Sequence, residues 1–484
     1  MKISLLILMT ILFSGCMVGP NYRPPLTYMP NNYSETPPPE EAWLVSDGAF
    51  FEWWKRFDDP LLDALLKESA RCNFDLRIAQ EHICQARAQF MIQTANLLPQ
   101  FSFDGQAARF RSSKNILASA TSFGVLFQNF FLAGFDAAWQ IDLFGGLRRA
   151  RKAALFTAEA VEENARFTQI AVLSEVAMQY SVIRALQQKV LNALAIVQTD
   201  QDELDYVLDR FQSGLAGELE VESVRAVLDS DLAAVQSYES LLYQAIYSLS
   251  ILIGQPPESI PERFNAIGPI PEAHGLIPVG LPSQLLCRRP DIRSAERQLA
   301  SATEQIGVSV ANLFPSFSLT SANLFQSRLN SSNFGFASNH FRELFRHASE
   351  TWSYGVSIFL PLIDFGRRLG DIKVHNSLQR EALLNYEKTV IGALQEIESA
   401  LTAYFKEEKR EALLRDQTDV NWKALKLLED QFQAGLANAT QVAEAKRTYL
   451  ISKSILTDSQ QALATNLIAV YKALGGEWEC FYTP

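Results

Sequence analysis

The sequence predicts a mainly α chain with a small β part. Three observations lead to this fold class: an internal duplication, very long segments without glycine or proline, and short alternating strands. Ala95–Phe103 (ANLLPQFSF) returns as Ala311–Leu319 (ANLFPSFSL), and Arg210–Ala216 (RFQSGLA) returns as Gln431–Ala437 (QFQAGLA). The copies lie roughly 220 residues apart, far more than the 20–50 residues of a solenoid unit. The chain is therefore one long arrangement that occurs twice.

Residues 1–15 are predicted to be a lipoprotein signal peptide. Lys2 precedes a short apolar stretch, Ile3–Phe13, and a membrane-spanning helix would need about 20 residues. Ser14-Gly15-Cys16 resembles a bacterial lipobox, in which the cysteine is acylated and becomes the mature N-terminus. The alternative is an ordinary secretory signal that happens to contain a cysteine. We predict lipidation (palmitate) at Cys16, and Met17 after it favours the outer membrane.

The first copy, residues 61–253, begins with a helix and a strand hairpin. Arg71–Leu98 contains no Gly or Pro and is ended by Pro99, which predicts one helix. Phe135–Leu143 alternates strictly between apolar and other residues, which predicts a strand. Phe101–Gln106 is a weaker candidate for its partner strand.

Two long helices complete the first copy. Leu147–Ser213 is 67 residues without Gly or Pro, about 100 Å of helix at about 1.5 Å per residue. Gly214 is a typical residue after a helix end, and Glu218–Ile253 then continues for 36 residues. Within the first of these helices, apolar residues repeat every seven positions, which predicts coiled-coil packing. They are Val176, Ile183, Val190, Val197, Leu204 and Phe211.

The second copy, residues 283–474, has the same order of elements. The predicted elements are a helix at Pro290–Phe314, strands that include Tyr354–Leu360, a long helix at Asp371–Ala434, and a helix at Asn438–Leu474. Residues 16–60 form a predicted N-terminal strap, residues 254–282 a linker rich in Pro and Gly, and residues 475–484 a tail. In both copies the two shorter helices together match the long one. They can therefore stack end to end against it.

Four predicted strands per chain imply an oligomer. In lipid, only helices and closed barrels satisfy the backbone, and the smallest single-chain barrels have about 8 strands. Two chains would give 8 strands and three would give 12, and a pore wide enough for cargo favours 12. The alternative is a solvent-exposed hairpin at the end of a coiled-coil rod.

Composition bears on the class of protein. The net charge of −11 argues against nucleic acid as a partner. The five histidines are scattered and form no metal-ligand motif. The four cysteines other than Cys16 have no zinc-type spacing, so we interpret these cysteines as packing residues. No nucleotide-binding or nucleophile motif is present. We therefore predict that the chain is not an enzyme and needs no cofactor or metal.

Three motifs resemble those of one family. Leu281–Ile292 (LPSQLLCRRPDI), Val18–Tyr22 (VGPNY) and Trp53–Pro60 (WWKRFDDP) are similar to motifs of the outer-membrane factor family, the TolC-like and NodT-like channels of tripartite efflux pumps. The resemblance implies a homotrimer with a shared 12-stranded β-barrel in the outer membrane and a long coiled-coil α-barrel in the periplasm. It also implies a periplasmic adaptor (membrane fusion) protein as partner, and an inner-membrane pump that acts through this adaptor.

The resemblance also implies which residues carry the function. Thr440, Glu444 and Arg447 match positions that constrict the periplasmic mouth, with three Glu444 carboxylates converging in a threefold ring and held by Arg447. A solvated helix face is the alternative. The adaptor would contact the tips, whose candidate residues are Gly214, Leu215, Gly435 and Leu436. Ordinary packing at the helix ends is the other interpretation of the two leucines.

The sequence thus predicts a passive export duct for small molecules across the outer membrane and periplasm. A duct for type I protein secretion and a coiled-coil lipoprotein without a pore are the alternatives. The duplicated aromatic strands favour a channel over a spacer.

Overall fold

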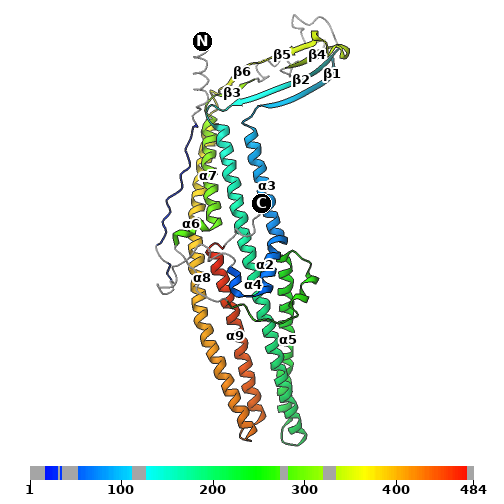
Figure 1. Cartoon of the computed structure of the whole chain (residues 1–484), viewed down its shortest axis with the longest axis vertical. Helices are drawn as coiled ribbons and strands as arrows, with labels where there is room; N and C mark the ends of the chain where they lie inside the picture. The colour runs from blue at the N-terminus through cyan, green and yellow to red at the C-terminus, as the bar shows by residue number, and fades with distance from the viewer. Residues whose placement is uncertain are drawn as a thin grey trace. The chain divides into compact units, whose positions relative to one another are not determined.

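The computed structural model describes residues 17–30, 33–34, 53–111, 127–272, 282–319 and 334–476 (Figure 1). It divides into two compact units. The unit that we call the strand unit comprises the described parts of Met1–Leu26, Ile83–Val161 and Ala295–Tyr386. The second, the tip unit, comprises those of Thr27–His82, Glu162–Ser294 and Glu387–Pro484. Across the described residues, no helix combines the length and the apolar composition that crossing a bilayer requires.

In the described residues, the strand unit contains one sheet of six strands. They occupy four parallel lines across the sheet, because two of these lines each consist of two short strands placed end to end. β1 (Gln100–Arg111) and β2 (Phe127–Ile141) form an antiparallel hairpin, paired from Gln100 with Ala138 to Arg111 with Phe127. The third line consists of β3 (Ser316–Leu319) and β4 (Phe334–Ser338), which both pair with β2. The fourth consists of β5 (Glu350–Trp352), paired with β4, and β6 (Val356–Phe359), paired with β3.

The predicted strands are found, but with different bounds. The hairpin is longer than predicted, because β1 continues to Arg111 and β2 begins at Phe127. In the second copy the predicted strands are found as β5 and β6, and Tyr354 and Leu360 lie just outside β6 (Val356–Phe359). Pro361 has no N–H to donate to a neighbouring strand, which is consistent with β6 ending before it.

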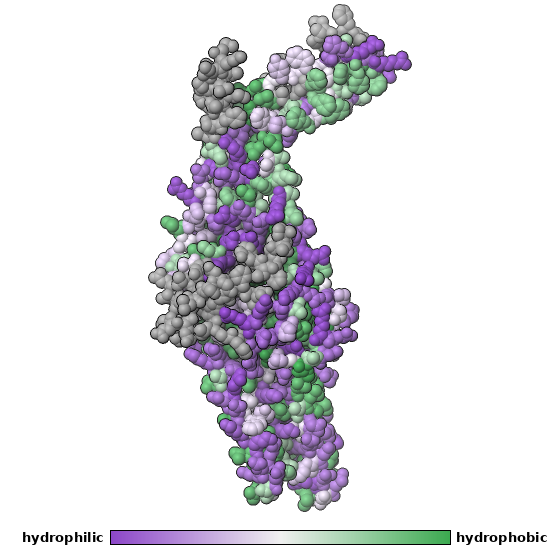
Figure 2. Space-filling view, viewed as in Figure 1, coloured by the Kyte–Doolittle hydropathy of each residue, from purple (hydrophilic) through white to green (hydrophobic). Residues whose placement is uncertain are grey.

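The sheet exposes apolar side chains. Phe101 and Phe103 on β1 are 78% and 62% exposed, and Phe135 on β2 is 62% exposed. In Figure 2 hydrophobic residues gather over the strands. Further exposed apolar residues of the second copy are Phe334, Trp352, Tyr354, Val356, Ile358 and Phe359.

The prediction of one helix from Arg71 to Leu98 is wrong. The structure has α2 (Pro60–Cys72) and α3 (Phe74–Ala95), separated at Asn73. Asn73 has φ −58° and ψ 133°, which is not helical, and its Oδ1 accepts from Leu76 N at 3.1 Å as a cap of α3. Its Nδ2 donates to the carbonyl oxygen of Leu252 at 2.9 Å, so tertiary contact fixes the break.

The long helices follow the predicted pattern closely. α4 (Gly146–Gln212) and α5 (Glu218–Ile253) lie within one residue of the predicted bounds. α7 is Pro290–Ala311 and α9 is Ala439–Ala473. α8 (Arg367–Gln433) begins four residues before its predicted start, because Asp364 accepts from Gly366 N and Arg368 N and so organises its first turn.

The tip unit has a helical core. Leu204 and Val207 of α4 pack with Val221 and Leu228 of α5, as in a coiled coil. Of the residues in the seven-residue repeat, Val176 and Ile183 are fully buried, whereas Phe211 near the turn is 44% exposed. The 3-10 helix η2 (Trp53–Phe57) contributes the buried Trp53, whose ring stacks on Tyr471 with ring centroids 5.3 Å apart.

Candidate functional site

One arginine joins three helices in the tip unit. Arg447 on α9 donates from Nη1 to Oδ1 of Asp200 on α4 at 3.1 Å, and from Nη2 to Oδ2 of Asp231 on α5. Asp200 is 1% exposed, and the Arg447 side chain is 30% exposed. We call Asp200, Asp231 and Arg447 the arginine clamp. It is an ion-paired crosslink between α9 and the α4–α5 pair.

Within the clamp, the surroundings of the Asp200 carboxyl group disfavour its charged form. The pKa of Asp200 is raised to about 7, first by burial and then by the neighbouring Asp231 carboxyl, while the charge of Arg447 opposes both effects. Oδ2 of Asp200 has no hydrogen-bond partner among the described residues. Burial also raises the pKa of Glu203, with Arg447 lowering it and Glu444 raising it. The charge of the clamp therefore changes near neutral pH.

The three predicted gate residues all lie on the first turns of α9. Arg447 contacts Asp200 and Asp231 of its own chain, so its described ion pairs are made across helices and not with Glu444. Glu444 is exposed and Thr440 is half-buried. Convergence of Glu444 carboxylates between subunits remains a prediction.

The sequence reasoning missed the two acidic members of the clamp. Asp200 follows Ala193 by seven residues and Ile196 by four, so it continues a helical face that is buried or half-buried. A charged residue on such a face was the available signal. Its partners could not be found without the register of three helices.

The predicted tip glycines form two equivalent turns. Gly214 and Gly435 have φ of 76° and 75°, the left-handed conformation that favours glycine. In each turn the following leucine N–H donates five residues back, Leu215 to the Arg210 carbonyl and Leu436 to that of Gln431, both at 2.8 Å. Leu215 is 70% and Leu436 79% exposed, so neither packs on its own turn.

The proposed lipid anchor, Cys16, lies outside the described residues, but the residues after it are held firmly in the strand unit. Val18 N donates to the Phe144 carbonyl at 3.1 Å. Arg149, fully buried, donates to the carbonyls of Val18 and Gly19 and pairs with Glu304 at 2.8 Å. Gly19 has φ +89°, and an added Cβ would lie 2.6 Å from Cα of Gly307.

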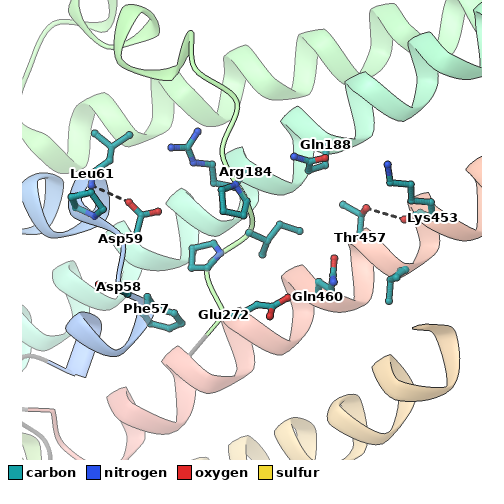
Figure 3. Close-up of a pocket in the computed structure, with 15 residues that line it drawn as sticks. Phe57, Asp58, Asp59, Leu61, Arg184, Gln188, Glu272, Lys453, Thr457 and Gln460 are labelled. Atoms are coloured by element: carbon teal, nitrogen blue, oxygen red, sulfur yellow. Dashed lines mark hydrogen bonds between the residues drawn. The ribbon is translucent and has the colours of Figure 1, made fainter. Parts of the chain in front are cut away.

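A cavity of about 810 Å³ lies in the tip unit between α4, α9, and the segments around Asp59 and Pro271 (Figure 3). Arg184 donates from Nε to Tyr180 Oη, and from Nη1 to Gln187 Oε1 and to the Ala266 carbonyl, at 2.8–2.9 Å. Asp59 accepts from Leu61 N at 2.9 Å and from Tyr180 Oη. Arg184 and Asp59 are therefore already engaged by groups of the chain itself.

Within the part of the chain that the structure describes, no group of three or more His, Cys, Asp or Glu side chains is placed to hold a metal ion.

Comparison with known proteins places these features in context. A family model described as outer membrane efflux protein matches residues 65–255 and 281–476. Nodulation protein T of Rhizobium leguminosarum bv. trifolii is 25% identical over 472 residues, which are 96% of this chain and 95% of that protein. The toluene efflux pump outer membrane protein TtgC of Pseudomonas putida is 30% identical over 472 residues, 96% of this chain and 94% of that protein.

A solved structure agrees with the fold. The outer-membrane channel OprN is 27% identical, has a TM-score of 0.81, and is matched over 96% of this chain and 100% of its own. The duplicated helical arrangement and the small sheet are therefore shared with a known channel.

Proposed function

The chain belongs to the outer membrane efflux protein family, and from that premise we propose that three copies form the passive outer-membrane duct of a tripartite efflux system. The predicted class, an outer-membrane efflux channel, is confirmed by this membership and by the likeness to OprN. Small organic molecules are the proposed cargo, because TtgC is named as part of a toluene efflux pump. The duct would carry out no chemical step of its own.

The sheet is the observation that carries this proposal. In the described residues, β1 pairs only with β2, and β5 and β6 pair only with β4 and β3, so both edges of the sheet remain open. Open edges cannot stand in lipid, where every backbone group needs a partner. Three chains with four lines each would give 12 strands and close the barrel. The exposed aromatic residues of the strands would then face lipid.

We assign the gate to the arginine clamp and to Glu444. The clamp crosslinks α9 to α4 and α5, so opening the mouth would require separating Arg447 from Asp200 and Asp231. Glu444 would contribute to a ring of three carboxylates at the constriction. Thr440 lies one helical turn closer to the tip.

The tips and the N-terminus supply the proposed contacts to partners. Leu215 and Leu436, exposed beside the turns at Gly214 and Gly435, would meet a periplasmic adaptor that connects the duct to an inner-membrane pump. Acylation of Cys16 would anchor the chain to the outer membrane.

The test is made on the purified full-length protein in detergent. Native mass spectrometry should give the mass of three chains with acyl groups on Cys16, and planar bilayers should show a channel. A monomer without lipid contradicts the proposal.

The gate is tested by Arg447→Ala, which should raise the conductance of the resting channel. Arg410→Ala is the matched control, because Arg410 pairs only locally with Glu407 on α8 in the described contacts. Equal conductance in the two variants removes Arg447 from the gate.

A further inference from the structure

A second cavity, of about 300 Å³, lies between α4, α5 and α9 in the tip unit. Each helix contributes residues at spacings of three, four and seven, the positions that normally carry large apolar side chains at a helix–helix seam. Here each helix presents a small residue instead: Ala193, Ala234 and Ser454. The hollow follows from these three residues. Its volume is at the small end of the range of ligand cavities, about 300–1,000 Å³.

An unpaired hydrogen-bond donor lies in the wall of the cavity. Asn192 lines it and is 3% exposed, and Nδ2 of this residue has no hydrogen-bond partner in the described part of the structure. Buried amide groups are nearly always paired. An occupant with a hydroxyl or carbonyl oxygen would supply the missing acceptor.

One ammonium group already lies at the cavity, and it belongs to the chain itself. Nζ of Lys189 lies 2.7 Å from Oδ1 of Asp458 and 5.0 Å from the centroid of the Tyr238 ring. A carboxylate beside an aromatic face is a typical environment for an organic cation. The Lys189 side chain is a flexible chain of four methylene groups, and its partner Asp458 is 48% exposed. The Lys189 ammonium can therefore move out to solvent when another cation takes its place.

The local charge favours a cation. The cavity is lined by two carboxylates, Asp231 and Asp458, but by only one basic group, Lys189. Asp231 also accepts from Arg447, and it is next to the buried Asp200. Displacing Lys189 would leave Asp458 without its cation, so an occupant that takes this position is favoured if it is positively charged.

We propose that this cavity binds a small hydroxylated primary amine, of the size of a single amino sugar. The ligand ammonium takes the place of Lys189 Nζ between Asp458 and Tyr238. The Asn192 side-chain amide turns towards the cavity, and a ligand oxygen then accepts from its Nδ2. All the lining residues belong to one chain, and the cavity shares Asp231 with the arginine clamp.

The test is calorimetric titration of the full-length protein in detergent with glucosamine, and with glucose as the probe that lacks the amine. Glucosamine should bind saturably at one site per chain, and glucose should not. Lys189→Ala vacates the ammonium position, so it should strengthen glucosamine binding about tenfold. Asp458→Asn, which removes the carboxylate, should weaken it by about the same factor.

Cavity filling provides the matched pair of variants. Ala234→Leu places a larger side chain in the cavity and should abolish binding. Ala233→Leu makes the same change at the next, exposed position of α5 and should leave binding unchanged. Equal affinity for glucose and glucosamine overturns the proposal. The proposal is also overturned if glucosamine binds saturably to neither the wild type nor Lys189→Ala. In Lys189→Ala the competing ammonium of the chain is absent, so it cannot explain a failure to bind.

Discussion

The arginine clamp makes the stability of the tip unit depend on pH through Asp200. Its pKa is raised from 3.8 to about 7 in the folded chain, so the folded state binds the proton more tightly than the unfolded state. The contribution of Asp200 to stability is therefore greatest in acid, falls as pH rises from about 4 towards about 7, and levels off above that. A change in the pKa of Asp200 from 3.8 to about 7 corresponds to about 4 kcal/mol of unfolding free energy between the two ends of this pH range.

We predict that Asp200→Asn removes this dependence, because the amide keeps the shape of the carboxyl group but does not titrate. The measurement is hydrogen–deuterium exchange of backbone amides in α4 and α9 around Asp200 and Arg447, between pH 5 and 8 and corrected for intrinsic exchange. In the wild type the local opening equilibrium should rise by up to about tenfold per pH unit below 7 and level off above it. In Asp200→Asn most of this rise should be lost, and only the smaller change due to Glu203, whose pKa is also raised, should remain.

The control is Asp229→Asn, an exposed residue of α5, which should keep the wild-type profile. Parallel pH profiles for the wild type and Asp200→Asn would refute the reasoning, because the proton linkage would then belong to another group. The other carboxyl groups at this place are Asp231 within the clamp, and Glu203 and Glu444 beside it.

Three further predictions concern backbone and capping. Gly435→Ala should destabilise its turn by about 1 kcal/mol, since φ is 75° and nothing lies within 4 Å of an added Cβ; faster proteolysis at that tip would show it, and an unchanged rate would contradict it. Gly19→Ala should detach residues 17–22 from the strand unit, because the added Cβ would clash with Cα of Gly307. Hydrogen exchange of these residues should rise. Gly217→Ala is the control and should not change it, because nothing lies within 4 Å of a Cβ added there. Asn73→Ala removes two hydrogen bonds and should lower the thermal midpoint of helix loss, at about 1 kcal/mol per bond; an unchanged midpoint would show that the break between α2 and α3 is not held by this side chain.

The long helices could be predicted because glycine and proline mark their ends. α5 begins after Gly217 and ends before Gly254, and both bounds were readable from the chain alone. The break at Asn73 was not, because asparagine is tolerated inside helices and the break depends on the Leu252 carbonyl, 179 residues away. The division between β5 and β6 likewise follows from pairing to β4 and β3 rather than from local preference.

The candidate site was predictable only in part. The resemblance to a family pointed to Arg447, and the turn glycines followed from their spacing. Asp200, Asp231 and the cavity beside Asn192 depend on which faces of three helices meet, and periodicity within one helix does not fix that.

The short segment after Cys16 has a consequence for how the chain sits in a bilayer. Val18 is bonded to Phe144 and Arg149 at the junction between β2 and α4, so acyl chains on Cys16 would be tethered only two residues from that junction. The acyl chains would then fix how deeply the sheet sits in the outer membrane, relative to its inner leaflet. Inserting a few flexible residues after Met17 would keep the lipid but uncouple it from that level.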